Sequence, residues 1–205
     1  MEDRTALRDM VENWAVWRDS GQWDKLLTLW HEDSVMSATW QQSSGADFVA
    51  GSRAAWTRGV DVQHFLGGTN IELAGDRAVI QTKMTIGQRS VVHDVLVDVT
   101  CEGRFYDCCE RRAGRWGIVW RQPIYERDRM DPVAPDATLT LDQALLDRFP
   151  VGYRHLGYLQ TQAGMTVKRD MPGRTGPEIE RLYARGAAWL AGRPGHPADP
   201  AYLDD

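Results

Sequence analysis

The chain is poor in cysteine, and its three cysteines are not spaced like metal ligands. They are Cys101 and the adjacent pair Cys108 and Cys109. An odd number that includes two neighbours does not fit a framework of paired disulfides, so we expect reduced thiols. Because no spaced cysteine or histidine knuckles accompany them, the sequence predicts no metal site.

Long hydrophobic runs are also missing. The first residues, "MEDRTALRDMVENW", are charged from the second position onward. A signal peptide requires an apolar core, and a membrane-spanning helix requires about 20 apolar residues. We therefore expect a cytoplasmic protein without membrane contact. Basic residues form no stripe and the formal net charge is −5, so nucleic acid is not an expected partner.

Tryptophan, in contrast, is abundant. The 205 residues include nine tryptophans and are 42 % hydrophobic, which is enough for a sizeable core. The length suits one domain, or one domain with an extension. Hydrophobic spacing predicts a helix over residues 4–18, a second helix from Gln22, and a third, weaker helix over residues 46–60, with a first strand within residues 31–40.

The pattern becomes β-rich from residue 64 to residue 128. Turn signals at residues 74–76, 87–89 and 112–115 divide this region into strands, and the last three form a meander. Helices followed by an antiparallel sheet indicate an α+β fold. A curved sheet with helices over one face would form a cone with one open end.

A second region follows the sheet. Residues 130–137, "MDPVAPDA", are typical of a linker, and three short helical patterns lie beyond them, within residues 140–149, 152–164 and 176–192. We therefore predict a first domain over residues 1–130. The helical extension over residues 131–205 would act as a lid or as an oligomer contact.

Three motifs resemble a known family. They are "NWAVWRDSGQWDKLLTLWHEDSV", "HFLGGTNIEL" and "GRFYDCCERRAGRWGIVWR", in this order. Together they are similar to the SnoaL-like branch of the NTF2-like superfamily, which includes scytalone dehydratase, bile acid 7α-dehydratase and γ-hexachlorocyclohexane dehydrochlorinase. The resemblance covers about residues 5–128. It implies an NTF2-like cone and an elimination reaction that uses no metal or organic cofactor.

The resemblance also implies a catalytic group of three residues. Asp19 lies eleven residues before Trp30, His64 precedes "GGTN", and Arg121 lies five residues after Trp116, as in the dehydrochlorinase pattern. His64 would move the proton, Asp19 would fix its tautomer, and Arg121 would stabilise negative charge. The structural alternatives are a histidine that only caps a strand, an Asp19 paired only with its neighbour Arg18, and an arginine exposed on a strand.

Further residues are candidates for substrate binding. Trp14 stands where the dehydrochlorinase has a lysine, so we interpret it as an aromatic wall. Trp40 and Met84 are also candidates for the wall, and Phe105 stands at a position that lines the pocket in the family. His93 is a candidate because it shares strand parity with Phe105. Tyr153 and His155 are candidates in the extension, where ordinary helix packing is the alternative.

The sequence thus predicts a cofactor-independent lyase that acts on a hydroxylated aromatic or polycyclic small molecule. Formaldehyde loss from a lignin-derived diarylpropane is one version of this chemistry, because such a lyase is also NTF2-like. Two alternatives remain open: an isomerase like ketosteroid isomerase, and a non-catalytic binding or structural subunit. We also expect a homo-oligomer, a trimer rather than a dimer, because sheets of this kind leave an apolar face to cover.

Overall fold

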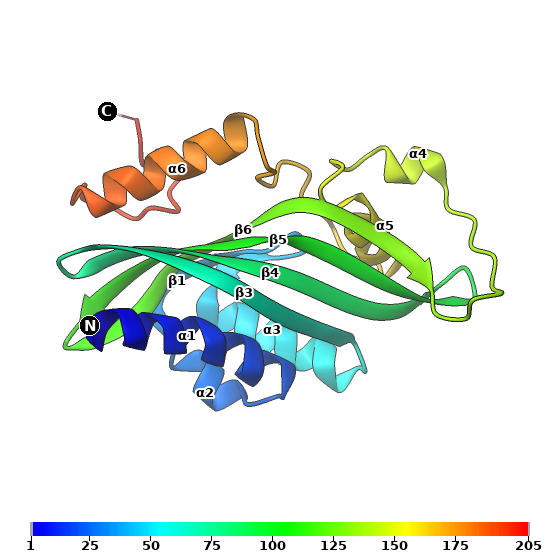
Figure 1. Cartoon of the computed structure of the whole chain (residues 1–205), viewed down its shortest axis with the longest axis horizontal. Coiled ribbons are helices and arrows are strands. Elements are labelled where there is room, and N and C mark those ends of the chain that lie inside the picture. The colour runs from blue at the N-terminus through cyan, green and yellow to red at the C-terminus, as the bar shows by residue number, and fades with distance from the viewer. Residues whose placement is uncertain (1, 205) are drawn as a thin grey trace.

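The computed structural model describes residues 2–204 and shows a curved six-stranded sheet with helices on both of its faces (Figure 1). The strand order is β2-β1-β6-β5-β4-β3, so the sheet is open, with β2 and β3 at its edges. Helices α1 to α3 cover one face, and α6 lies over the other. The predicted α+β cone is confirmed.

Three helices precede most of the sheet, as the spacing predicts. They are α1 (Glu2–Asp19), α2 (Trp23–Leu27) and α3 (Gly45–Thr57). The buried side of α1 is an apolar stripe that includes Leu7, Val11 and Trp14, the pattern of an amphipathic helix on a core. At the start of α3, the hydroxyl of Ser44 accepts the Asp47 backbone N–H at 3.0 Å, which satisfies one of the free donors at that end.

Six strands form the sheet, and long hairpins dominate it. Short strands β1 (Trp30–Ser37) and β2 (Gln42–Ser44) are followed by β3 (Asp61–Ala74), β4 (Arg77–Val92), β5 (Val95–Arg112) and β6 (Arg115–Pro132). All neighbouring strands are antiparallel except β1 and β6, which are parallel. The turns predicted at residues 74–76 and 112–115 are where two of the hairpins reverse.

The turn predicted at residues 87–89 is wrong. Strand β4 continues through it, since Gly87 pairs with Gln63 on one side and Thr100 on the other. The chain instead reverses at His93 and Asp94, which have φ values of 48° and 63°. Two consecutive residues with positive φ are typical of the tight hairpin turns that match the strand twist. His93 therefore lies in a turn, where the strand parity used to place it does not apply.

The extension contains α4 (Gln143–Leu146), α5 (Arg154–Gln162) and α6 (Pro177–Leu190), near the three predicted positions. It does not form a separate core. Leu156 of α5 belongs to the same buried cluster as Trp14 and Phe105 inside the cone. Helix α6 contributes Leu182 and Trp189 to a second cluster on the opposite face of the sheet.

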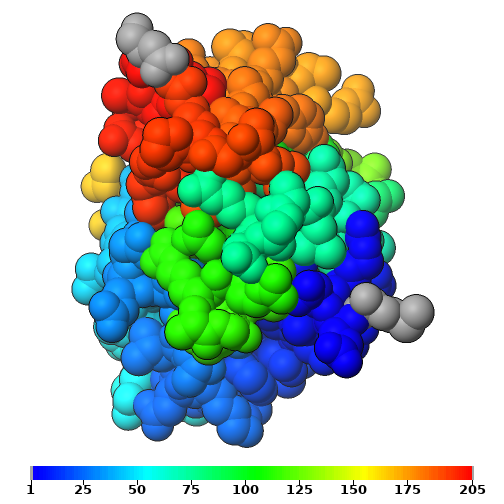
Figure 2. Space-filling view, turned by 90° about the vertical axis from the view of Figure 1, so that its left-hand side faces the viewer, coloured from blue at the N-terminus to red at the C-terminus, as the bar shows by residue number. Residues whose placement is uncertain are grey.

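Figure 2 shows the resulting layers from one end of the molecule, with the C-terminal segment above, two hairpin tips in the middle and the N-terminal helices below. Because α6 covers apolar residues on its face of the sheet, the reason given for a trimer does not apply to the covered part. The homo-oligomer remains a prediction.

Two glycines allow the extension to approach the sheet closely. A Cβ on Gly186 of α6 would lie 1.8 Å from the Tyr106 hydroxyl, and one on Gly152 would lie 2.2 Å from the Tyr125 carbonyl oxygen. Real side chains do not tolerate such distances. Both positions therefore require glycine for steric reasons, although neither has a positive φ.

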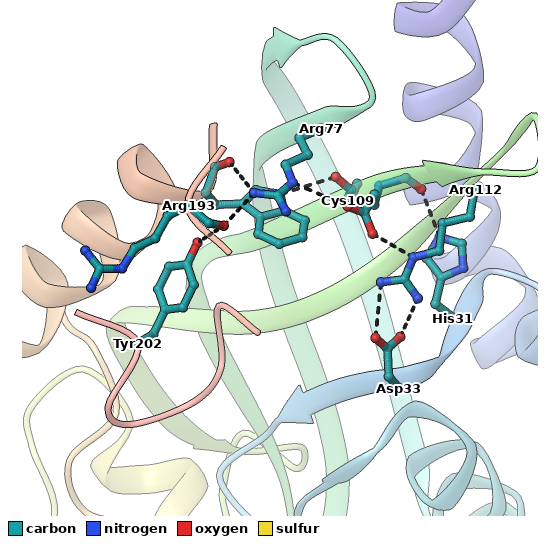
Figure 3. A network of polar contacts seen from close by, with 9 residues as sticks. His31, Asp33, Arg77, Cys109, Arg112, Arg193 and Tyr202 are labelled. Atoms are coloured by element: carbon teal, nitrogen blue, oxygen red, sulfur yellow. Dashed lines mark hydrogen bonds and ion pairs between the residues drawn. The ribbon is translucent and has the colours of Figure 1, made fainter. Parts of the chain in front are cut away.

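A polar network fastens the C-terminal segment to the end of the sheet (Figure 3). The Arg77 guanidinium lies 3.8 Å from the centroid of the Trp189 ring and donates to the backbone oxygens of Trp189 and Arg193 at 3.1 and 2.8 Å. It also contacts Glu110 at 3.3 Å, and Glu110 pairs with Arg112 at 2.6 Å. The cation therefore joins β4, β5 and the end of α6.

Candidate active site

A cavity occupies the inside of the cone. Its volume is about 480 Å³ when the part open to solvent is included, and its wall comes from α1, α3, the inner face of the sheet and α5. Helix α5 contributes Leu156 and Gln160, and the Gln160 amide oxygen accepts a hydrogen bond from Thr39 at 2.8 Å. The extension thus forms part of the wall, a position compatible with the predicted lid. Four predicted residues line the cavity: His64, Trp14, Trp40 and Phe105.

Asp19 and His64 are in direct contact, at the distance expected for a dyad. The Asp19 Oδ1 atom lies 2.8 Å from His64 Nδ1, and Oδ2 accepts the His64 backbone N–H at 2.5 Å. One carboxylate therefore fixes both the ring and the backbone of the histidine. Asp19 lies at the last position of α1 and His64 lies in β3. With Nδ1 occupied by Asp19, Nε2 is the nitrogen left for a substrate.

The surroundings of His64 favour its neutral form. Burial lowers the pKa of His64, and the charges of Arg18 and Arg121 lower it further, while Asp19 acts in the opposite direction. Loss of water disfavours a charged imidazole. His64 is therefore neutral at neutral pH. When Nδ1–H donates to Asp19, the lone pair on Nε2 is free to accept a proton.

The structure does not place Arg121 on the cavity wall, whereas the sequence predicts that it contacts the departing charge. Its side chain is fully buried and makes a two-point ion pair with Asp107, at 2.6 and 2.8 Å. Its guanidinium carbon lies 4.3 Å from the Trp14 ring centroid and 4.2 Å from that of Phe105. His64 contacts the same two rings, so Arg121 influences the dyad through its charge and its packing.

Four of the predicted substrate-binding residues also lie off the cavity wall. Met84 is on the same face of β4 as the lining residue Ile86 but is packed into the core. His93 lies in the β4–β5 turn, where its Nε2 is 2.6 Å from the Tyr158 hydroxyl.

Tyr153 and His155 hold the extension in place. The Tyr153 hydroxyl donates to the Lys168 backbone oxygen at 2.9 Å. His155 Nδ1 lies 2.9 Å from Asp128, whose other oxygen accepts the backbone N–H groups of His155 and Leu156. Asp128 thereby satisfies free donors at the start of α5. Neither residue is on the cavity wall.

Arg18 is not among the residues that the sequence predicts for the cavity. Arg18 lines the cavity, and its side chain is 8 % exposed. A signal was available, because Leu7, Val11, Trp14 and Arg18 lie at helical spacing on one stripe of α1. An arginine at the end of an apolar stripe is unusual, and it faces the interior here. Gln88, Phe48 and Tyr125 were also missed.

Three further observations concern metal binding, membrane-spanning helices and the cysteines. Within residues 2–204, no three side chains among histidine, cysteine, aspartate and glutamate are grouped in a way that could hold a metal ion. Over the same residues, no helix is long and apolar enough to cross a membrane. The three cysteines are free and buried.

Comparison with other proteins shows relatives along most of the chain. Pea pathogenicity protein 2 of Fusarium vanettenii is 33 % identical over 201 residues, which covers 93 % of this chain and 86 % of the relative. An uncharacterized protein of Emericella nidulans is 32 % identical over 207 residues, with 93 % and 87 % covered.

Solved structures share the fold at lower identity. The structure of LinA, a hexachlorocyclohexane dehydrochlorinase, superposes with a TM-score of 0.55 at 16 % identity, covering 68 % of this chain and 95 % of LinA. A candidate scytalone dehydratase of Novosphingobium aromaticivorans gives 0.53 at 16 % identity, covering 67 % and 95 %. The SnoaL-like domain family matches residues 1–122, more than half of the chain. The protein therefore belongs to the family of SnoaL-like domains.

Proposed function

We propose that the protein is a cofactor-independent lyase that eliminates water from a hydroxylated aromatic small molecule. The observation that carries the proposal is the Asp19–His64 pair, whose 2.8 Å contact fixes a buried imidazole on the wall of the cavity inside the cone. Trp14, Trp40 and Phe105 on the same wall supply flat apolar surfaces, which favour an aromatic substrate.

The dyad would perform the reaction in two proton transfers. The neutral Nε2 atom of His64 takes a proton from the carbon adjacent to the one that bears the leaving hydroxyl. The electrons of that C–H bond form the new double bond, and the C–O bond breaks. The imidazolium then returns its proton to the departing hydroxide, which leaves as water. The Asp19 carboxylate stabilises the imidazolium between these transfers, and such acid–base catalysis contributes on the order of 10²–10⁴ in rate.

The fold is compatible with this chemistry. A dehydrochlorinase and a candidate scytalone dehydratase share it. Their low identity to this chain supports the fold and leaves the reaction to be argued from the site. A non-catalytic binding protein would have no use for a carboxylate that holds a cavity histidine at two points, and this favours an enzyme.

The test is a turnover assay on aromatic β-hydroxy ketones, beginning with the aldol of benzaldehyde and acetone. Its dehydration gives a conjugated enone that can be followed by ultraviolet absorbance. Wild-type protein should form enone, and His64→Asn should not. The matched control is His155→Asn, because His155 is also held by an aspartate at 2.9 Å but lies off the cavity wall. Turnover of no member of the panel, or equal turnover by His64→Asn, would contradict the proposal.

A further inference from the structure

We propose that Arg18 is the anion-binding residue of the cavity, and that it holds a substrate oxygen carrying full or partial negative charge, such as a carboxylate or a carbonyl that becomes an enolate. This inference deepens the proposed function, because it names the substrate class of the same site. It assigns to Arg18 the role that the family resemblance implies for Arg121, which is to stabilise negative charge on the substrate.

The position of Arg18 is the first argument. It lies one residue before Asp19 at the end of α1, and its guanidinium faces the interior of the cone as part of the cavity wall. Nη1 donates to the Val62 backbone oxygen at 3.2 Å and contacts Asp19 Oδ1 at 3.3 Å. Val62 is paired in register with Gln88, which also lines the cavity. Arg18, Gln88 and His64 thus supply polar groups to a largely apolar cavity.

The second argument is an unused donor. The Nε atom of Arg18 is buried and has no hydrogen-bond partner among residues 2–204. A guanidinium offers five N–H donors in a rigid fork that fits a carboxylate or carbonyl oxygen. Burying such a donor without a partner is unfavourable, and burial also lowers the pKa of Arg18, although Asp19 opposes this. A ligand oxygen would satisfy the donor and compensate for the lost water.

The third argument is the contrast with Arg121. Asp107 already binds Arg121 at two points. The Arg121 Nη1 atom also lacks a hydrogen-bond partner among the described residues, but Arg121 does not line the cavity. Asp19, in contrast, contacts only Nη1 of Arg18, at 3.3 Å, and uses both oxygens for His64. Among the cavity-lining residues of the described chain, Arg18 is the one arginine or lysine. It therefore retains positive charge and donor capacity for a ligand.

The consequence for the reaction is a polarised substrate. If Arg18 holds the carbonyl oxygen of a β-hydroxy ketone, the proton removed by His64 is the one made acidic by that carbonyl. The negative charge that develops as the C–H bond breaks then resides on the oxygen beside the guanidinium. The arrangement favours hydroxylated aromatics that also carry a carbonyl or carboxylate group.

Binding of paired probes tests this without turnover. The probes are trans-cinnamate and its uncharged isostere trans-cinnamamide, with affinity measured by calorimetry in the His64→Asn background. The structure predicts that cinnamate binds more tightly by about tenfold or more, as expected for hydrogen bonds to a charged group. In Arg18→Met the preference should fall below about threefold. The matched control is Arg8→Met, which removes the same charge from an exposed position of α1.

Two outcomes would overturn the proposal: no preference for cinnamate in the His64→Asn protein, or a preference that survives Arg18→Met. If Arg18→Met does not fold, nuclear magnetic resonance of ¹⁵N-labelled arginine decides. The wild-type protein should show one Nε–H signal that moves on cinnamate addition and is missing from Arg18→Lys. Absence of such a signal refutes the assignment. If His64→Asn loses enone formation but still prefers cinnamate, the dyad is needed for turnover and the anion site binds independently of it.

Discussion

Replacing Asp107 by asparagine should destabilise the protein strongly. Asp107 and Arg121 are both fully buried and joined by two contacts of 2.6 and 2.8 Å. The substitution leaves a buried guanidinium without its counter-charge, which costs about 3–5 kcal/mol when one partner of a buried pair is removed. In a chain of this length each kcal/mol corresponds to about 2–4 °C in Tm. We therefore expect Tm to fall by roughly 6–20 °C.

Thermal unfolding followed by circular dichroism measures the fall in Tm, and urea unfolding measures the change in the free energy of unfolding. A double variant, Asp107→Leu with Arg121→Met, removes both charges and should recover most of the lost stability, since apolar residues replace such pairs without large cost. The matched control is Asp98→Asn, because the Arg89–Asp98 pair makes similar contacts while its side chains are 48 % and 44 % exposed. That variant should remain close to wild type.

The result that refutes this reasoning is an Asp107→Asn protein as stable as wild type. Equal stability of the single and double variants would also contradict it, because the loss would then not come from the unpaired cation. Either result would mean that the Arg121 charge is available for another purpose, such as the direct catalytic contact first predicted for it.

Three further expectations concern acidity, packing and metals. Burial lowers the pKa of His64, His31 and His196 below the ordinary value of 6.5, so the unfolded chain takes up protons first as pH falls. The free energy of unfolding should therefore decrease below about pH 6.5, and a flat urea midpoint from pH 7 to about 5 would contradict this. Gly186→Ala should lower the free energy of unfolding by about 1–3 kcal/mol through overpacking. Gly68→Ala should not lower it, because a Cβ at Gly68 would meet open space. Equal urea midpoints for the two variants would disprove the steric account. Exhaustive chelation should leave enone formation unchanged, and loss of activity with recovery on metal addition would exclude the proposed mechanism.

Local patterns predicted the parts of the structure that depend on neighbouring residues. The apolar stripe that includes Leu7 and Trp14 predicted α1, and family spacing brought Asp19 and His64 to one site. The helix follows from the periodicity of its own apolar residues, and the pair follows from two motifs, one around Asp19 and one around His64. The 2.8 Å contact between Asp19 and His64 is therefore a result that the sequence could anticipate.

The ion pair of Arg121 with Asp107 could not be anticipated, because a register shift creates it. Arg112 pairs with Arg115 across the turn, and counting back from this pair would place Asp107 opposite Trp120. A shift between Cys108 and Cys109 places it opposite Arg121 instead. One extra residue in a strand changes the cross-strand partner of every residue beyond it. The amino-acid composition around Cys108 and Cys109 gives no indication of this extra residue.

The turn at His93 and the packing of α6 on the sheet could not be predicted from the sequence for related reasons. Residues 87–89 contain a glycine and look like a turn, yet strands on both sides pair with β4 there. His93 and Asp94 have positive φ without glycine, so the true turn carries a weaker signal. The closeness of Gly186 to Tyr106 depends on residues far apart in sequence, which local periodicity does not describe.

The central claim is that Asp19 and His64 act as one catalytic unit, and the most direct measurement is kcat of Asp19→Asn for the benzaldehyde–acetone aldol. The variant retains the size of the side chain but removes the charge that fixes the histidine tautomer and stabilises the imidazolium. With an unchanged circular dichroism spectrum, kcat should fall by on the order of 10²–10⁴. A folded Asp19→Asn protein that turns over at the wild-type rate would contradict the account.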